Sequence, residues 1–432
     1  MVTRTHPQRV ALHNEIHARP PEAMGAPLAI SHMVMLTTAA ERDASRGHLA
    51  ALLREHHLPL PGGDANHLRM DFGAFRLRWE LHTEFVTWTF SRPVDVAALR
   101  GNEPPVGRDA VPRQWLDSLP GECLAAMHLW VLAGDGAPAA VAPLLREDTL
   151  VGSRVADGQA RVYTDFALHA DGFSRTVLLA GGDPADAEAG MSPRRLGRLV
   201  QRLLEIDTYR MAAMLGLPAA RETGATLAAA EQELAALASA IRGAGREDEP
   251  QLLDRLTKLA GEIESQYAGS HARFSASTAY FELVDRRLAD IREARLPGLQ
   301  TIGEFIDRRL SPARATCEWT TRRQDALSQR VSRISSLLRT RVEIEQQQST
   351  QDLLGAMNRR QQLQLRLQAT VEGLSVAAIT YYIVGLVSYL AKGAQAVGWP
   401  FAAESTAAAA IPVVALAVWW SLRRLHSKVF AA

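Results

Sequence analysis

The residues near the N-terminus that could do chemistry are two histidines, His13 and His17, on either side of Glu15 in the stretch LHNEIHARPP. Side chains four residues apart lie on one face of a helix, so both imidazoles could bind one divalent metal ion. The zinc-protease motif HExxH places its glutamate next to the first histidine, whereas Glu15 points to a different face. The spacing therefore allows a metal or ligand site but argues against hydrolysis.

A structural interpretation of the same stretch remains open. A short helix would end at Ala18, because the residue before a proline avoids the helical conformation and Pro20 follows Arg19. A third metal ligand has no fixed position in the pattern, and the candidates are His32, His56, His57, His67 and Asp71. The candidate residues here are therefore His13, Glu15 and His17, and the sequence does not identify a metal.

A second candidate is the stretch WELHTEF, in which Glu80, His82 and Glu84 occupy alternate positions. In a strand these three side chains point to the same side of the sheet. If the row were buried, its ionisation would be perturbed, which is typical of a functional site. If it were exposed, or if a turn fell at His82, it would be ordinary solvated surface.

The element that would position this row is an antiparallel sheet in an α+β domain, which we expect at residues 25–185 after a histidine-rich segment at 1–24. Alternating apolar and polar residues predict strands at 28–38, on both sides of a turn within 72–90, from 123, and across 150–182. An amphipathic helix is expected at 41–57. There is no GxxxxGK[ST] or GxGxxG loop, so nucleotide hydrolysis by these loops is not expected.

From Ser192 onward the apolar spacing is helical, in a coiled-coil region at 190–310 and a stalk helix at 311–371. We expect a break near Gly216, another at 243–250, and then two helices, one at 251–267 and one around 281–291. Leu327, Val331, Ile334 and Leu338 repeat at heptad spacing, which requires a partner helix. That partner could be the helices at 227–267 of the same chain or the same stalk in another copy.

The C-terminus contains two apolar stretches that predict a transmembrane hairpin at 372–424. The first, GLSVAAITYYIVGLVSYLA, has 19 residues without a charge, and a helix of that length rises about 28 Å, close to the thickness of a bilayer. The second runs from Ser405 to Leu422, and the link between them is short. The alternative is a buried helical hairpin of a soluble protein.

Charge predicts how the hairpin is oriented. Arg359, Arg360 and Arg366 precede the first span, whereas the link carries only Lys392. Arg423, Arg424 and Lys428 follow the second span, just before and within a basic tail at 425–432. The positive-inside rule then places both termini in the cytoplasm.

One face of the first span carries small or hydroxyl-bearing residues, namely Ser375, Ala378, Tyr382, Gly385 and Tyr389, and ends at the charged Lys392. In a membrane such a face is expected to contact protein or water rather than lipid. It could be a helix-packing face, within the hairpin or between subunits, or it could line a pore.

Composition excludes several classes of protein. The 48 basic and 47 acidic residues give a net charge of +1, which does not fit a nucleic-acid binder. Two cysteines cannot form a disulfide framework or a zinc ribbon, and they fit a reducing compartment. The first ten residues contain no apolar run, so a secretory signal is not expected.

Four stretches together resemble a bacterial family of uncharacterised membrane-anchored proteins: LHNEIHARPPEAM, WELHTEF, TYRMAAMLGLP and the long stretch LLGAMNRRQQLQLRLQATVEGLSVAAITYYIVGLVSYLAKG. The resemblance implies a bacterial inner-membrane location and no established activity. The order of segments is also similar to that of the CorA-type two-span divalent-cation transporters, whose pentamers carry a Gly-Met-Asn signature after the first span. Here that position reads KGAQAVGWPFAAE, without the signature.

These observations predict an oligomeric two-pass inner-membrane protein with a cytoplasmic domain that responds to a ligand or metal, with lipid and further copies of itself as partners and a pentamer as one arrangement. It could be a CorA-like ion channel or transporter. The alternative is a non-conducting scaffold or sensor that assembles through its coiled coil. A metal-dependent enzyme is a third, less favoured hypothesis.

Overall fold

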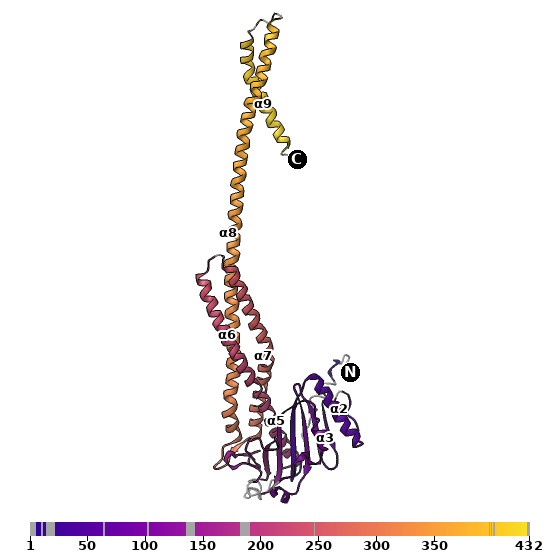
Figure 1. The fold of residues 1–432 in the computed structure, drawn as a ribbon. Coiled ribbons are helices and arrows are strands. Elements are labelled where there is room, and N and C mark those ends of the chain that lie inside the picture. Colours follow the sequence, from indigo (N-terminus) through magenta and orange to yellow (C-terminus); the bar gives the residue numbers. More distant parts are fainter. Residues whose placement is uncertain are drawn as a thin grey trace. The chain divides into compact units, whose positions relative to one another are not determined.

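The computed structural model describes residues 6–9, 12–13, 22–63, 65–101, 103–134, 143–181, 191–245, 247–396, 398, 400 and 402–429. The chain divides into two compact units, Met1–Ile334 and Ser335–Ala432, and the boundary lies within one long helix. Each unit is described by itself below (Figure 1).

The first unit contains one nine-stranded sheet, with the strand order β2-β3-β4-β1-β5-β8-β7-β6-β9. The strands are β1 Leu28–Leu36, β2 His67–Asp71, β3 Arg76–Leu81, β4 Phe85–Pro93, β5 Glu122–Ala133, β6 Val151–Val155, β7 Ala160–Thr164, β8 Ser174–Ala180 and β9 Ala294–Arg295. Short helices α2 Ala39–Glu55 and α3 Arg113–Leu116 and the 3-10 turns η1 Ala97–Arg100, η2 Gly107–Ala110 and η3 Glu147–Thr149 join them.

The sheet is mixed, so the expectation of an antiparallel sheet was wrong at one place. Strands β5 and β8 pair in parallel, and the other pairs are antiparallel. The sequence argument assumed that successive strands are neighbours. Here β6, β7 and β8 form an antiparallel meander, and its last strand, β8, is the one that pairs with β5. This strand runs in the same direction as β5.

Alternation along the strands separates an apolar face from a polar one. On β3 and β4, Leu77, Trp79, Trp88 and Phe90 form a buried cluster with Leu49, Leu52 and Leu53 of α2. The intervening residues Arg78, Glu80, Thr87 and Thr89 therefore point to the opposite face. Helix α2 is held at its start by a capping box between Thr38 and Glu41.

Four helices complete the first unit: α5 Pro193–Met214, α6 Gly216–Gly243, α7 Glu249–Ile291 and the beginning of α8 Ile302–Gln395. Side chains of α5 and α7 share the main core with the sheet, for example Leu199, Phe281 and Ile30. The breaks near Gly216 and at 243–250 are confirmed. The two helices expected for 251–291 are one helix of 43 residues, because no proline or glycine pair interrupts it.

Within this unit α6, α7 and the first part of α8 run side by side (Figure 1). Gln324 of α8 donates to Ser270 of α7 at 3.1 Å, and Ser328 donates to Glu264 at 2.7 Å. Leu327 and Val331 are each 1% exposed. For these two heptad positions, the partner is therefore provided by helices of the same chain.

The second unit contains the rest of α8 and helix α9 Ala403–Val429. Both helices contain a stretch long and apolar enough to cross a membrane. Only 11% of the residues in the first stretch and 6% in the second are buried. This unit therefore exposes its apolar side chains rather than enclosing them.

Candidate functional site

A small polar cavity of about 170 Å³ lies on the polar face of the sheet, against α5 and α7. Its wall combines strand residues with residues of both helices and of the β3–β4 turn: His32, Arg78, Glu80, His82, Thr87, Thr89, Gln201, Leu204, Glu205, Thr208, Tyr209 and Arg287. Cross-strand pairing explains the strand side, because Arg78 lies opposite Thr89, which lies opposite His32. We call this space the polar cavity.

His32 forms the buried centre of the wall, with 4% of its surface exposed. Its Nδ1 lies 2.8 Å from Thr89 Oγ1, and its Nε2 lies 3.0 Å from Thr208 Oγ1. Thr208 donates its own hydroxyl proton to the carbonyl of Leu204, so it accepts the proton of Nε2. Nδ1 is then the acceptor for the Thr89 hydroxyl, which assigns a neutral imidazole.

The electrostatic environment keeps His32 neutral. Burial, with smaller contributions from the charges of Arg78 and His82, lowers its pKa from 6.5 to about 3. Both ring nitrogens are occupied by hydrogen bonds, so neither is available to a metal ion. His32 therefore organises the wall and is not a metal ligand in this arrangement.

Arg78 and Glu80 are two positions apart on β3 and form a buried ion pair. Arg78 Nη2 donates to Glu80 Oε1 at 2.7 Å, and the two residues are 8% and 9% exposed. Beside this pair, Arg78 Nε and the hydroxyl of Thr87 have no hydrogen-bond partner among the residues that the structure describes. A buried polar atom without a partner lowers stability.

The helical side of the cavity carries a second ion pair. Arg287 of α7 donates through Nε to Glu205 of α5, whose other oxygen accepts from Gln201 at 2.8 Å. Arg287 also lies 3.2 Å from Asp290. Each of these wall charges therefore already faces a charge of opposite sign.

The row predicted from WELHTEF is divided by the structure. Glu80 faces the polar cavity, and His82, in the β3–β4 turn, lines both it and a neighbouring cavity of about 550 Å³. Glu84 instead accepts hydrogen bonds from Arg273 at 2.8 Å and Tyr280 at 2.9 Å, both on α7. Burial raises the pKa of the Tyr280 hydroxyl. The row thus contributes two cavity residues and one anchor of the turn.

The structure describes only part of the histidine-rich segment at 1–24. Glu15 and His17 lie outside the described residues, and His13 is exposed. His56 packs edge-on against Phe72, and Asp71 accepts from Arg76 at 3.0 Å. Within the described part of the chain, no group of three or more His, Cys, Asp or Glu residues could hold a metal ion.

A cluster that the sequence argument missed lies on the other face of the sheet. Ser31 Oγ is 2.9 Å from His128 Nδ1, and His128 Nε2 is 3.4 Å from Asp171 Oδ2. Ser31 is completely buried, and Gly107 packs so closely that an added Cβ would lie 2.5 Å from the Ser31 nitrogen. Substrate cannot reach this serine, so the cluster is a structural network. No sequence spacing signals it, because its members come from three distant segments.

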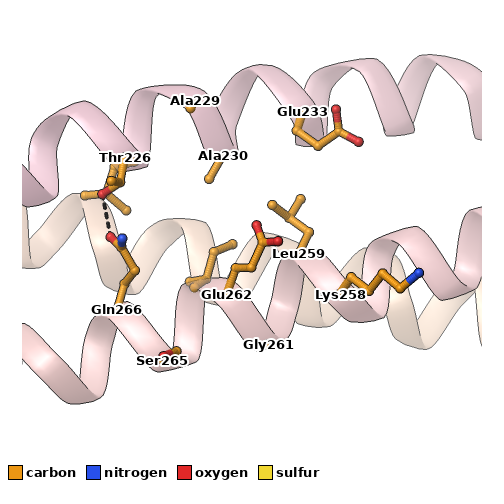
Figure 2. A pocket seen from close by; sticks show the side chains of 12 residues that line it. Thr226, Ala229, Ala230, Glu233, Lys258, Leu259, Gly261, Glu262, Ser265 and Gln266 are labelled. Carbon is orange, nitrogen blue, oxygen red and sulfur yellow. Dashed lines mark hydrogen bonds between the residues drawn. The ribbon is translucent and has the colours of Figure 1, made fainter.

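A larger cavity in the first unit is a groove of about 830 Å³ between α6 and α7 (Figure 2). A hydrogen bond between Thr226 and Gln266 closes one end. The charged rim residues Glu233 and Lys258 are paired with Arg255 at 2.5 Å and Asp254 at 2.9 Å. Small residues, namely Ala229, Ala230 and Gly261, create this groove.

On the face of the first span that runs from Ser375 to Lys392, the bulky side chains are exposed in the single chain. Tyr382 is 75% and Tyr389 76% exposed, and no atom lies within 4 Å of a Cβ added at Gly385. These residues therefore do not pack within the second unit. A packing face between copies and a pore lining both remain compatible with this position.

Comparison with known proteins gives one match. A family model described as "Protein of unknown function (DUF3422)" matches residues 4–429. No curated protein and no solved structure matches the chain.

Proposed function

The chain belongs to the DUF3422 family of unknown function, and from its geometry we propose that it is an oligomeric receptor in the bacterial inner membrane. The end of α8 and helix α9 anchor it in the bilayer. The polar cavity binds a small ligand, and contacts between copies of α8 hold the assembly together.

The membrane anchor is supported by the low burial of the two apolar stretches, since only 11% of the residues in the α8 stretch and 6% of those in the α9 stretch are buried. A core helix of a soluble protein would be mostly enclosed. Here Leu386, Leu390, Val413 and Leu416 are 64–69% exposed. So much contiguous apolar surface is not stable in water, whereas lipid tails would cover it.

The orientation of the anchor follows from charge. Arg359, Arg360 and Arg366 precede the first span, Arg424 follows the second, and the short link carries Lys392. The two spans then form an antiparallel hairpin with both termini and the polar cavity in the cytoplasm.

Membrane retention tests the anchor. After alkaline carbonate washing, the full chain should stay in the membrane pellet, and a variant that ends at Gln368 should move to the supernatant. Recovery of the full chain in the supernatant would contradict the anchor.

The oligomer rests on an apolar strip of α8, formed by Leu353, Met357, Leu367, Val371 and Leu374, which we call the α8 strip. All five residues are 60–72% exposed. Their spacing is that of the a and d positions of a heptad, with Arg360 and Gln364 as a polar layer between them. The occupant we propose is the same strip of a second copy, since identical heptads match in register and polar a/d residues fix that register.

A second candidate function is ion conduction, which the exposure of Tyr382 and Tyr389 favours. In a ring of copies, these residues and Gly385 would face the axis. Ion flux into liposomes that contain the purified chain tests this candidate. Flux that a Gly385→Leu variant abolishes would support it, and the absence of flux would leave the receptor without a pore.

A further inference from the structure

We infer that the polar cavity binds a small zwitterion, a molecule that carries one carboxylate and one ammonium group. The inference deepens the proposed receptor function and rests on it. It is drawn from three properties of the cavity: the charge balance of its wall, its size, and the polar atoms that lack a partner.

The wall presents equal numbers of opposite fixed charges. Arg78 is paired with Glu80, Arg287 is paired with Glu205, and His32 is neutral. A ligand with a net charge would bring an uncompensated charge into a mostly buried space, which is strongly unfavourable. A ligand with no net charge avoids this penalty.

The size of the cavity limits the ligand to a few atoms. A volume of about 170 Å³ is slightly larger than a cavity of about 150 Å³ that holds benzene, and it would hold about five or six water molecules. Glycine or alanine, with five or six non-hydrogen atoms, fits this volume. A nucleotide or a sugar does not.

The polar atoms of the wall favour a zwitterion over a neutral apolar molecule. Arg78 Nε and the Thr87 hydroxyl are buried donors on neighbouring strands, and neither has a partner among the described residues. A ligand carboxylate that enters between them would accept from both. Thr87 lies directly opposite Glu80 in the β3–β4 register. The carboxylate of Glu80 can then accept from the ammonium group of the same ligand.

The test is isothermal titration of the full chain in detergent with three probes of similar size at pH 7: glycine, acetate and methylammonium. We expect glycine to bind at least tenfold more tightly than either singly charged probe. Saturable binding of acetate or methylammonium at least as tight as that of glycine would overturn the zwitterion and leave the receptor function intact. No binding of any probe would overturn both, whereas membrane retention would still report on the anchor.

Two variants sharpen the test. Thr87→Val removes a buried hydroxyl that has no partner, so folding should be preserved while glycine binds about tenfold more weakly. Thr257→Val, on the exposed side of α7, is the matched control and should bind like the wild type. Glu80→Gln keeps the shape of the wall but makes its charge positive, so the preference should move from glycine to acetate. An unchanged preference in that variant would contradict the role of charge balance.

Discussion

The polar face of the sheet and the surface of the second unit depart from ordinary protein organisation in opposite ways. In the polar cavity, charged and polar groups such as Arg78 and Thr87 are buried, at 8% and 3% exposure. In the second unit, apolar side chains such as Leu374 are exposed, at 72%. Buried polar groups need partners, and exposed apolar groups need a cover. The two binding surfaces proposed above, one for a small polar molecule and one for lipid and further copies, rest on this contrast.

The largest effect is expected from breaking the buried ion pair of the cavity. Glu80→Ala leaves the Arg78 guanidinium buried without its carboxylate, so the free energy of unfolding should fall by about 3–5 kcal/mol. Thermal and urea unfolding of the purified chain measure this change. Glu122→Ala, at an exposed position, is the control and should change stability by less than about 0.5 kcal/mol. A loss of that small size for Glu80→Ala would mean that the pair is not buried.

The neutral state of His32 predicts how stability depends on pH. The unfolded chain binds the proton near pH 6.5, whereas folded His32 binds it only near pH 3. The unfolded state therefore holds more protons between these values, and stability should fall by up to about 1.4 kcal/mol for each pH unit below 6.5. Comparing unfolding at pH 7 and pH 5 measures the slope.

His32→Gln removes this titration and should reduce the slope, while His271→Gln, at an exposed position on α7, should leave it unchanged. If the His32 variant had the wild-type slope, the stability loss at low pH would come from other groups.

The α8 strip can be broken without touching the cavity. Leu367→Asn places a polar group in the proposed contact between copies, so association should weaken about tenfold or more, a change of about 1.4 kcal/mol or more. Analytical ultracentrifugation in detergent measures the oligomer. Leu365→Asn is matched in chemistry and in exposure, at 59% against 66%, but lies off the heptad, and it should assemble normally. Equal weakening by both variants would exclude the strip as the interface.

The smallest effect is expected at the β3–β4 turn. Glu84→Gln weakens hydrogen bonds to Arg273 and Tyr280 in a partly buried position, so the free energy of unfolding should change by about 1 kcal/mol or less. A shift in the thermal midpoint as large as that of Glu80→Ala would show that the anchor of the turn is as important as the buried pair.

The sequence patterns predicted strands and helices well wherever the apolar residues follow one period, either that of a strand or that of a helix. Alternation in RLRWEL and FVTWTF gave β3 and β4, and the absence of breaking residues gave a continuous α8. The parallel pairing of β5 with β8 could not be predicted, because it depends on where a later meander attaches and not on any local signal.

The candidate site was predicted only in part, for a related reason. Glu80 and His82 were identified from their alternation, but the same pattern included Glu84, which the turn directs to α7. The other half of the cavity comes from Glu205, Thr208 and Arg287, on helices more than a hundred residues away in the sequence. Only tertiary packing brings these side chains to the strands, so spacing along the chain contains no trace of them.

The central claim, that lipid covers the exposed apolar surface and the globular unit is cytoplasmic, is tested most directly by labelling cysteines in intact spheroplasts. In separate single-cysteine variants, Ala396→Cys in the short link should react with a membrane-impermeant maleimide before lysis. The native Cys123, exposed in the first unit, should react only after lysis. Labelling of Cys123 before lysis, or protection of Ala396→Cys until lysis, would contradict this topology.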